Sequence, residues 1–224
     1  MLIRLIASCS LLLLLATPLV AADDYRAEVS DSPLPDEVAE PIAKLLNSQS
    51  IKMVKGESRA VCEVWLCKEW PVQADFEESA QILYPFTPGQ IIGVLRFPRK
   101  SADFRDQPIT KGVYTLRYML QPVDGNHVGT SPTRDFFLLV SAELDQDPAL
   151  LDYKKLVKES AEAAGSSHPA MLCLQKALKA DKLPAVRANE EHQWQILQFA
   201  APAKAGDKVS ELPVDLVIEG ISAE

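Results

Sequence analysis

The stretch from Gly112 to Val140 constrains the fold most, because two apolar arms in it flank a polar segment. Alternate residues of the first arm predict one apolar face, opposite Thr115 and Arg117: Tyr114, Leu116, Tyr118 and Leu120. Alternate residues of the returning arm predict a matching apolar side: Phe136, Leu138 and Val140. The pattern therefore predicts two strands of a buried sheet, joined by a long polar loop.

Further apolar runs predict more strands, at 51–54, 60–67, 91–97, 170–175, 193–199 and 214–219. For 170–175 the alternative is the start of a second helix through Leu178, and Pro169 and the shortness of the apolar run favour the strand. Helical spacing predicts two helices, near 36–47 and 149–164, with Gly165 ending the second. Pro41 lies inside the first helix, which therefore either bends there or starts near Glu40. Gly112 stands two residues before Tyr114, an arrangement found in sandwich domains whose tyrosine hydroxyl ties back a corner. We expect a mainly β antiparallel sandwich, immunoglobulin-like or related, with one or two peripheral helices.

The first 22 residues have the pattern of an export signal. Arg4 supplies a positive start, an apolar run follows, and Val20-Ala21-Ala22 offers small residues for cleavage. We therefore expect a signal peptide at 1–22, a flexible segment at 23–35 and one β-sandwich domain at 36–224. The expected location is periplasmic or extracellular, with no membrane span after cleavage.

The remaining 202 residues carry 22 basic and 31 acidic side chains, a formal charge of −9. A negative chain without a basic cluster argues against nucleic acid and against anionic membrane surfaces as partners. Such acidity is typical of a soluble protein and does not by itself indicate a cationic partner.

Three cysteines remain after cleavage: Cys62, Cys67 and Cys173. Cys62 and Cys67 fall in one predicted strand, about 16 Å apart at 3.3 Å per residue, and on opposite faces, too far for a disulfide. Any bridge must therefore include Cys173. The alternative is that all three are buried thiols that act as small apolar side chains.

Glu63 is the one charged residue inside a predicted strand with two apolar faces. A carboxylate there lies at a margin of the layer or is buried and paired, and we expect an arginine as its partner.

The densest polar constellation lies in the loop at 123–135. Its candidate ligand-binding residues are Asp124, Asn126, His127, Arg134 and Asp135. A carboxylate, an imidazole and a guanidinium on one rim can hold a sugar, a carboxylate or a metal. The plainer interpretation is turn chemistry, because Asp-Gly and Asn favour turns and Arg134 can pair with a neighbouring carboxylate.

Catalytic and cofactor motifs give no assignment. The histidines at 127, 168 and 192 are not spaced as a metal pair, although His127, His168 and Asp124 can converge in space. We find neither a Gly-x-Ser-x-Gly elbow nor a phosphate-binding glycine loop. We therefore expect no cofactor and name no catalytic residue.

One resemblance is carried by Gly-Val-Tyr-Thr-Leu-Arg-Tyr, Gln-Pro-x-Asp-Gly-Asn-His-x-Gly and Arg-Asp-Phe-x-Leu-Leu, together with Cys62-Glu63-Val64-Trp65-Leu66 and His168-Pro169. The chain resembles a family of uncharacterised exported bacterial proteins over most of its mature length. The resemblance implies export and a shared architecture, and assigns no role to any residue.

Three functions remain open. The leading hypothesis is a non-catalytic exported module that binds an envelope component or a small ligand at the 123–135 rim. The second is an exported hydrolase or metal-dependent enzyme that uses His127 with Asp124 and His168. The third is a scaffold without a small-molecule site.

Overall fold

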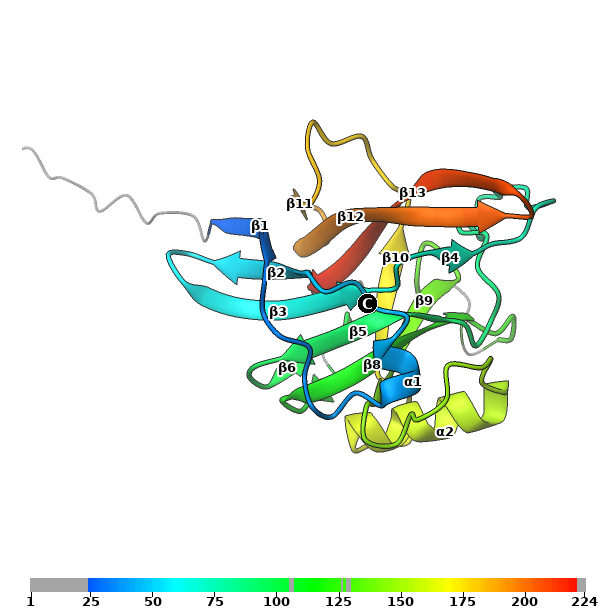
Figure 1. Cartoon of the computed structure of the whole chain (residues 1–224), viewed down its shortest axis with the longest axis horizontal. Helices are drawn as coiled ribbons and strands as arrows, with labels where there is room; N and C mark the ends of the chain where they lie inside the picture. The colour runs from blue at the N-terminus through cyan, green and yellow to red at the C-terminus, as the bar shows by residue number, and fades with distance from the viewer. Residues whose placement is uncertain (1–23, 105–106, 126, 128–129, 221–224) are drawn as a thin grey trace, which may run out of the picture.

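The computed structural model describes residues 24–104, 107–125, 127 and 130–220, which form a mainly β fold (Figure 1). The expected signal peptide at 1–22 lies outside the described residues. Within them, one 11-stranded sheet has the order β1 (Tyr25–Ser30), β2 (Ser50–Lys55), β3 (Arg59–Leu66), β5 (Ile91–Phe97), β8 (Gly112–Leu120), β9 (Asp135–Ser141), β10 (Met171–Gln175), β13 (Lys208–Glu219), β12 (Trp194–Ala205) and β11 (Ala185–Asn189). The eleventh strand of this sheet, β4 (Trp70–Pro71), lies off this order and pairs in parallel with β12. A separate two-stranded ribbon consists of β6 (Ser101–Ala102) and β7 (Pro108–Ile109).

The sheet curls into two layers, and β10 turns the corner between them. Its residues Met171 and Cys173 pair with β9, whereas Leu174 and Gln175 pair with β13. A strand that changes partners in this way is a known means of joining two packed layers. In Figure 1, β12 and β13 accordingly lie across the half of the sheet that contains β3, β5 and β8. The predicted class, a mainly β antiparallel fold with peripheral helices, is confirmed, and its relation to immunoglobulin-like domains stays a prediction.

The two predicted arms are the antiparallel neighbours β8 and β9. Leu116 lies opposite Leu139, and Tyr118 lies opposite Phe137, so these four side chains share one face. The predicted match of Tyr114, Leu116 and Tyr118 with Phe136, Leu138 and Val140 was therefore wrong, because the latter three share the face of Thr115 and Arg117. Alternation groups the residues within a strand, but the long loop left the register free, and a one-residue shift exchanges the faces.

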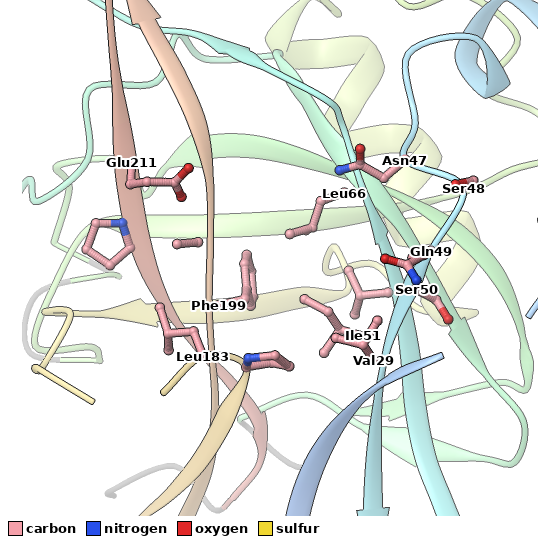
Figure 2. A pocket seen from close by; sticks show the side chains of 14 residues that line it. Val29, Asn47, Ser48, Gln49, Ser50, Ile51, Leu66, Leu183, Phe199 and Glu211 are labelled. Atoms are coloured by element: carbon pink, nitrogen blue, oxygen red, sulfur yellow. The ribbon is translucent and has the colours of Figure 1, made fainter. Parts of the chain in front are cut away.

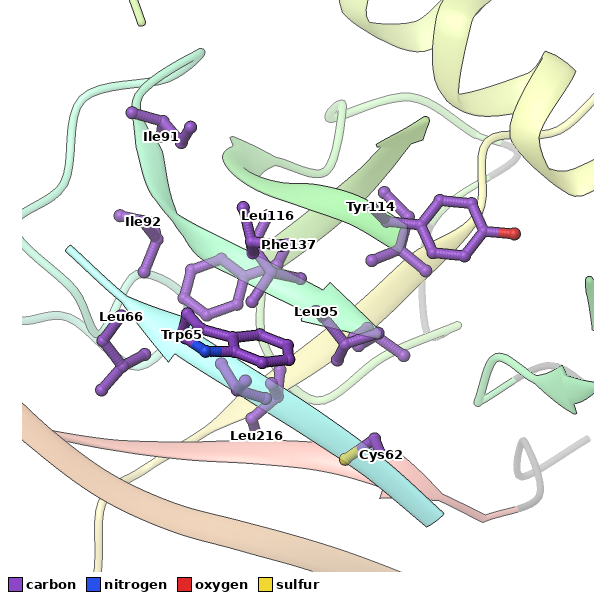
Figure 3. Close-up of a cluster of buried hydrophobic side chains, with 14 of the residues drawn as sticks. Cys62, Trp65, Leu66, Ile91, Ile92, Leu95, Tyr114, Leu116, Phe137 and Leu216 are labelled. Atoms are coloured by element: carbon purple, nitrogen blue, oxygen red, sulfur yellow. The ribbon is translucent and has the colours of Figure 1, made fainter. Parts of the chain in front are cut away.

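Both faces of this strand pair are buried. The face between the two layers forms the larger core, to which β3, β5, β8, β9 and β13 contribute; Figure 3 labels Trp65, Leu95, Leu116, Phe137 and Leu216 among its side chains. The opposite face forms a second cluster, which α2 (Tyr153–Ala164) covers: Phe104, Met119, Phe136, Leu138, Val140, Leu156, Met171, Cys173, Trp194, Ile196 and Val217. Because the sheet is covered on both faces, its central strands are apolar on both sides.

The second predicted helix is confirmed as α2. The carboxylate of Asp152 caps it by accepting a hydrogen bond from the backbone N–H of Lys154 at 2.9 Å. Gly165 ends it in the left-handed conformation, at φ 64°. The first helix, α1 (Glu40–Ala43), is shorter than the predicted 36–47, because Pro41 occupies its first turn and the helix starts at Glu40. Within the described part of the chain, neither helix has the length and apolar character to span a lipid bilayer.

The corner predicted at Tyr114 is present. The tyrosine hydroxyl donates a hydrogen bond to the backbone carbonyl of Thr110 at 2.8 Å. Gly112 makes room for this ring, because a Cβ atom at position 112 would lie 3.2 Å from the hydroxyl oxygen.

Two segments differ from expectation. The segment 23–35, expected to be flexible, contains strand β1, which pairs along its length with β2. Its alternation of Tyr25, Ala27 and Val29 with charged residues is a strand signal that the polar composition obscured. The strands predicted at 193–199 and 214–219 are longer than expected, because β12 continues to Ala205 and turns through two residues into β13, with Gly206 at φ 61°.

Candidate ligand-binding site

Asp135, the last of the predicted site residues, lies at the start of β9 and is completely buried. Its carboxylate accepts hydrogen bonds from the Tyr118 hydroxyl at 2.7 Å and from the backbone N–H groups of Leu83 and Tyr84 at 2.9 and 3.2 Å. Burial raises the pKa of Asp135, although these three donors act in the opposite direction. The carboxylate thus anchors the segment around Leu83 to the sheet and presents no free oxygen to a surface ligand.

Arg134 closes the neck of the loop. Its Nε donates a hydrogen bond to the carbonyl of Gln121 at 2.8 Å, and its own carbonyl accepts one from the Gln121 backbone N–H at 2.8 Å. The side-chain amide of Gln121 donates to the Thr130 hydroxyl at 2.9 Å, and that hydroxyl donates to the carbonyl of His127 at 3.0 Å. Arg134 and Gln121 therefore brace the loop from which His127 projects.

Asp124 and His127, two of the candidate ligand-binding residues, contact each other. The Nδ1 atom of His127 lies 2.7 Å from Oδ1 of Asp124, and the backbone N–H of His127 also donates to the carbonyl of Asp124 at 3.2 Å. The His127 side chain is 26% exposed and that of Asp124 is 48% exposed. Because Nδ1 is engaged, Nε2 is the imidazole atom left to meet a ligand. Asn126, the remaining predicted residue, lies outside the described residues.

His127 lies at an apolar pocket of about 200 Å³ between α2 and strands β8, β9 and β10. The apolar walls include Met119, Phe136, Leu138, Val157 and Met171. The polar groups that line the same pocket are His127, His168, Gln121, Tyr153 and Ser167. His168 is exposed and comes from the segment between α2 and β10, so two imidazoles from separate loops reach one pocket. An apolar cavity with a few converging polar groups is the usual form of a small-molecule site.

Sequence reasoning placed His168 near His127 only as one alternative, and it missed Gln121 and Tyr153. The sequence placed Tyr153 in the apolar pattern of the helix, which predicts a buried residue. In the structure it lies in the first turn of α2 and is 45% exposed. Gln121 carried a weak signal, as a polar residue directly after an apolar strand. The convergence itself depends on how β10 and α2 fold back on β9, which no local pattern records.

The other ionisable groups singled out by sequence or burial have structural partners. Glu63 is buried and accepts hydrogen bonds from Ser50 and from the guanidinium of Arg96, which confirms the predicted arginine. Burial tends to raise the pKa of Glu63, but hydrogen bonds from Ser32 and Ser50 and the charge of Arg96 outweigh it, so the pKa is lowered. Arg117 is fully buried and contacts both carboxylate oxygens of Asp145 at 2.8 Å.

All three described cysteines are unbridged and buried, as in the alternative without a disulfide. Burial raises the pKa of the Cys67 thiol to about 12 and that of the Cys173 thiol to about 11. Since the thiolate is the reactive form, these groups are poor nucleophiles at neutral pH. Among the described residues, no group of three or more His, Cys, Asp or Glu side chains is placed to hold a metal ion.

A larger cleft, of about 610 Å³, opens between the two layers on the other side of the sheet. Figure 2 shows Ile51 on β2 and Leu66 on β3 facing Phe199 on β12 across this space. Glu211 lies on one wall, and Asn47 and Gln49 lie on the other. The four predicted site residues that the structure describes, Asp124, His127, Arg134 and Asp135, do not line it.

Comparisons with protein-family models, with curated proteins and with solved structures give no match to this chain.

Proposed function

We propose that this protein is an exported, non-catalytic binding module of the cell envelope, and that it holds a small apolar acid in the pocket at His127 and His168. Export rests on the signal pattern at 1–22, which implies a periplasmic or extracellular location. The observation that carries the binding site is the placement of two imidazoles at one apolar pocket.

The pocket chemistry indicates the ligand class. Its walls are formed mainly by aliphatic, thioether and aromatic side chains, which favour an apolar body. Imidazole N–H groups at the mouth donate hydrogen bonds to an acceptor, and a protonated imidazole also attracts an anion. A volume of about 200 Å³ admits a ligand of the size of one ring with one acidic group.

Benzoate is a suitable probe, with benzyl alcohol as its uncharged analogue. Isothermal titration of the mature protein should show that benzoate binds more tightly than benzyl alcohol. His127→Ala and His168→Ala should each weaken benzoate binding about tenfold, or 1.4 kcal/mol. His192→Ala is the matched control, because the His192 ring stacks on Trp194 and does not line the pocket. If benzoate binds all three variants as tightly as it binds the wild type, the proposed site is wrong.

A second candidate function, an exported hydrolase, is favoured by one observation. A carboxylate on Nδ1 of His127 leaves Nε2 oriented as a general base, as in a catalytic triad. Ser167 lines the same pocket and is the available hydroxyl, but its side chain makes no hydrogen bond to either imidazole among the described residues. In such a reaction, the Ser167 hydroxyl oxygen would bond to the acyl carbon of an ester while its proton passes to Nε2 of His127. The ester C–O bond would break, the alcohol or phenol would leave with that proton, and a water molecule would then release the acid from Ser167.

Hydrolysis of 4-nitrophenyl acetate distinguishes the two functions. The binding module predicts that the rate in the presence of protein is the same for wild type, Ser167→Ala and His127→Ala. A rate that falls at least about a hundredfold in both variants supports the hydrolase, because general-base catalysis alone contributes that much.

A further inference from the structure

The cleft between the layers has no part in the proposed function, yet it has a volume of about 610 Å³. Binding sites for small molecules typically have about 300–1,000 Å³. The cleft lies between β2 and β3 of one layer and the β12–β13 hairpin of the other, and Figure 2 shows side chains from both layers pointing into it.

The floor of the cleft is a continuation of the inner core. Val64, Leu66 and Phe199 are at least 95% buried and line its base, while Trp70 packs edge-on against Phe199 behind it. Nearer the opening, the walls stay apolar: Val29, which is 55% exposed, Ile51, Leu183, Pro184 and Ala200. Protein interiors are normally packed without voids of this size, so an apolar space left open to solvent suits an apolar guest.

The charge of the cleft is unbalanced. Glu211 is its one ionisable lining residue, it is exposed, and no ion pair engages it among the described residues. The facing wall carries the uncharged polar residues Asn47, Ser48, Gln49 and Ser50, and no lysine or arginine of the described chain lines the space. A carboxylate at the rim of an apolar cleft favours a ligand with a positive charge and disfavours an anionic one.

We infer that this cleft is a second, independent binding site for an amphiphilic amine, that is, a molecule with an apolar chain and one ammonium group. The chain would lie against Leu66, Phe199 and Ile51, and the ammonium group would pair with Glu211 at the rim. The amides of Asn47 and Gln49 offer hydrogen-bond acceptors on the opposite wall. This site differs from the His127 pocket in the sign of the charge that it selects.

The test compares three ligands with the same chain, decylamine, 1-decanol and decanoate, by calorimetric titration below their aggregation concentrations. The mature protein used carries His127→Ala and His168→Ala, so that the proposed acid-binding pocket does not contribute. The expected order of affinity is amine, then alcohol, then carboxylate, with about tenfold or more between the first and last. Glu211→Gln should make the amine bind no better than the alcohol. Glu57→Gln, which neutralises an exposed glutamate outside the cleft, should leave all three affinities unchanged.

A steric variant tests the location independently of charge. Ala200→Phe places a large ring on a partly exposed wall of the cleft and should weaken all three ligands, while the unfolding midpoint reports whether the variant is folded. The inference is overturned if decanoate binds as tightly as decylamine, if Glu211→Gln leaves the preference for the amine intact, or if a folded Ala200→Phe variant binds like wild type.

Discussion

The two ends of the segment 124–135 have opposite environments, although the sequence presents them as one polar cluster. At the far end, Asp135 is buried and three donors saturate its carboxylate. At the near end, Asp124 and His127 contact each other, both side chains stay partly exposed, and His127 lines a pocket. The same residue type therefore stabilises the fold at one end and can meet a ligand at the other.

The comparison shows that a polar group can bind a ligand only where its hydrogen-bonding atoms are not already satisfied within the fold. A buried carboxylate must be hydrogen-bonded, and once its oxygens are satisfied it has no capacity left for a ligand. An exposed pair contributes little to stability because water competes for both partners. Substitutions at the two ends should therefore differ sharply in their effect on the free energy of unfolding.

Asp135→Ala should have the largest effect on stability, a loss of about 3 kcal/mol, because it leaves the buried Tyr118 hydroxyl and two buried backbone N–H groups without a hydrogen-bond acceptor. Urea unfolding measures this loss. Asp124→Ala is the matched control at the exposed end and should change the free energy of unfolding by less than about 0.5 kcal/mol. Equal losses of unfolding free energy in the two variants would contradict the claim that only the buried carboxylate stabilises the fold.

Tyr118→Phe should cost about 1.5 kcal/mol, less than Asp135→Ala, since it removes one of the three donors and leaves two backbone N–H groups in place. The double variant with Asp135→Ala should lose less than the sum of the two single losses, because both changes remove the same hydrogen bond. Strict additivity would show that Tyr118 and Asp135 act separately.

At acidic pH, the buried carboxylates Glu63 and Asp135 should change the pH dependence of the unfolding free energy in opposite directions. These changes should be smaller than the losses above. Folding lowers the pKa of Glu63, so this group stabilises the folded state at a pH above its unfolded pKa of about 4.3. That stabilisation is lost as the pH falls through the folded pKa. Folding raises the pKa of Asp135, so as the pH falls the folded state takes up this proton at a higher pH than the unfolded state does. The free energy of unfolding therefore increases as the pH falls towards the unfolded pKa of about 3.9.

Glu63→Gln should therefore flatten the loss of stability towards low pH, and Asp135→Asn should steepen it. Unfolding free energies measured in steps between pH 6 and about pH 3.5 test both signs. A change of the same sign in both variants would contradict the assigned pKa directions.

Much of the fold could be predicted from sequence because the strands carry local patterns. Alternation located β8 and β9, the Gly-x-Tyr spacing indicated the corner at Tyr114, and Gly165 marked the end of α2. The pairing of faces could not be predicted, because the register of β8 against β9 is set across a long loop. The strands predicted at 193–199 and 214–219 were also too short, because the alanines and prolines between them do not carry the apolar pattern of a strand although they pair in β12.

The candidate site was predictable only in part. The proximity of Asp124 and His127 follows from a turn and is local. That Asp135 faces inward and that His168 reaches the same pocket as His127 both depend on the packing of segments distant in sequence. Such packing leaves no periodic trace, so a polar loop gives the same signal whether its residues anchor the core or line a pocket.

The most direct test of the central claim uses the three histidines as reporters. NMR spectra of the mature protein should resolve the ring signals of His127, His168 and His192, and benzoate is then titrated in. Because His127 and His168 line one pocket and His192 stacks on Trp194 outside it, the first two signals should shift together with a single dissociation constant while the third stays unchanged. Shifts of His127 and His168 with different dissociation constants, or no shift in either, would contradict the account.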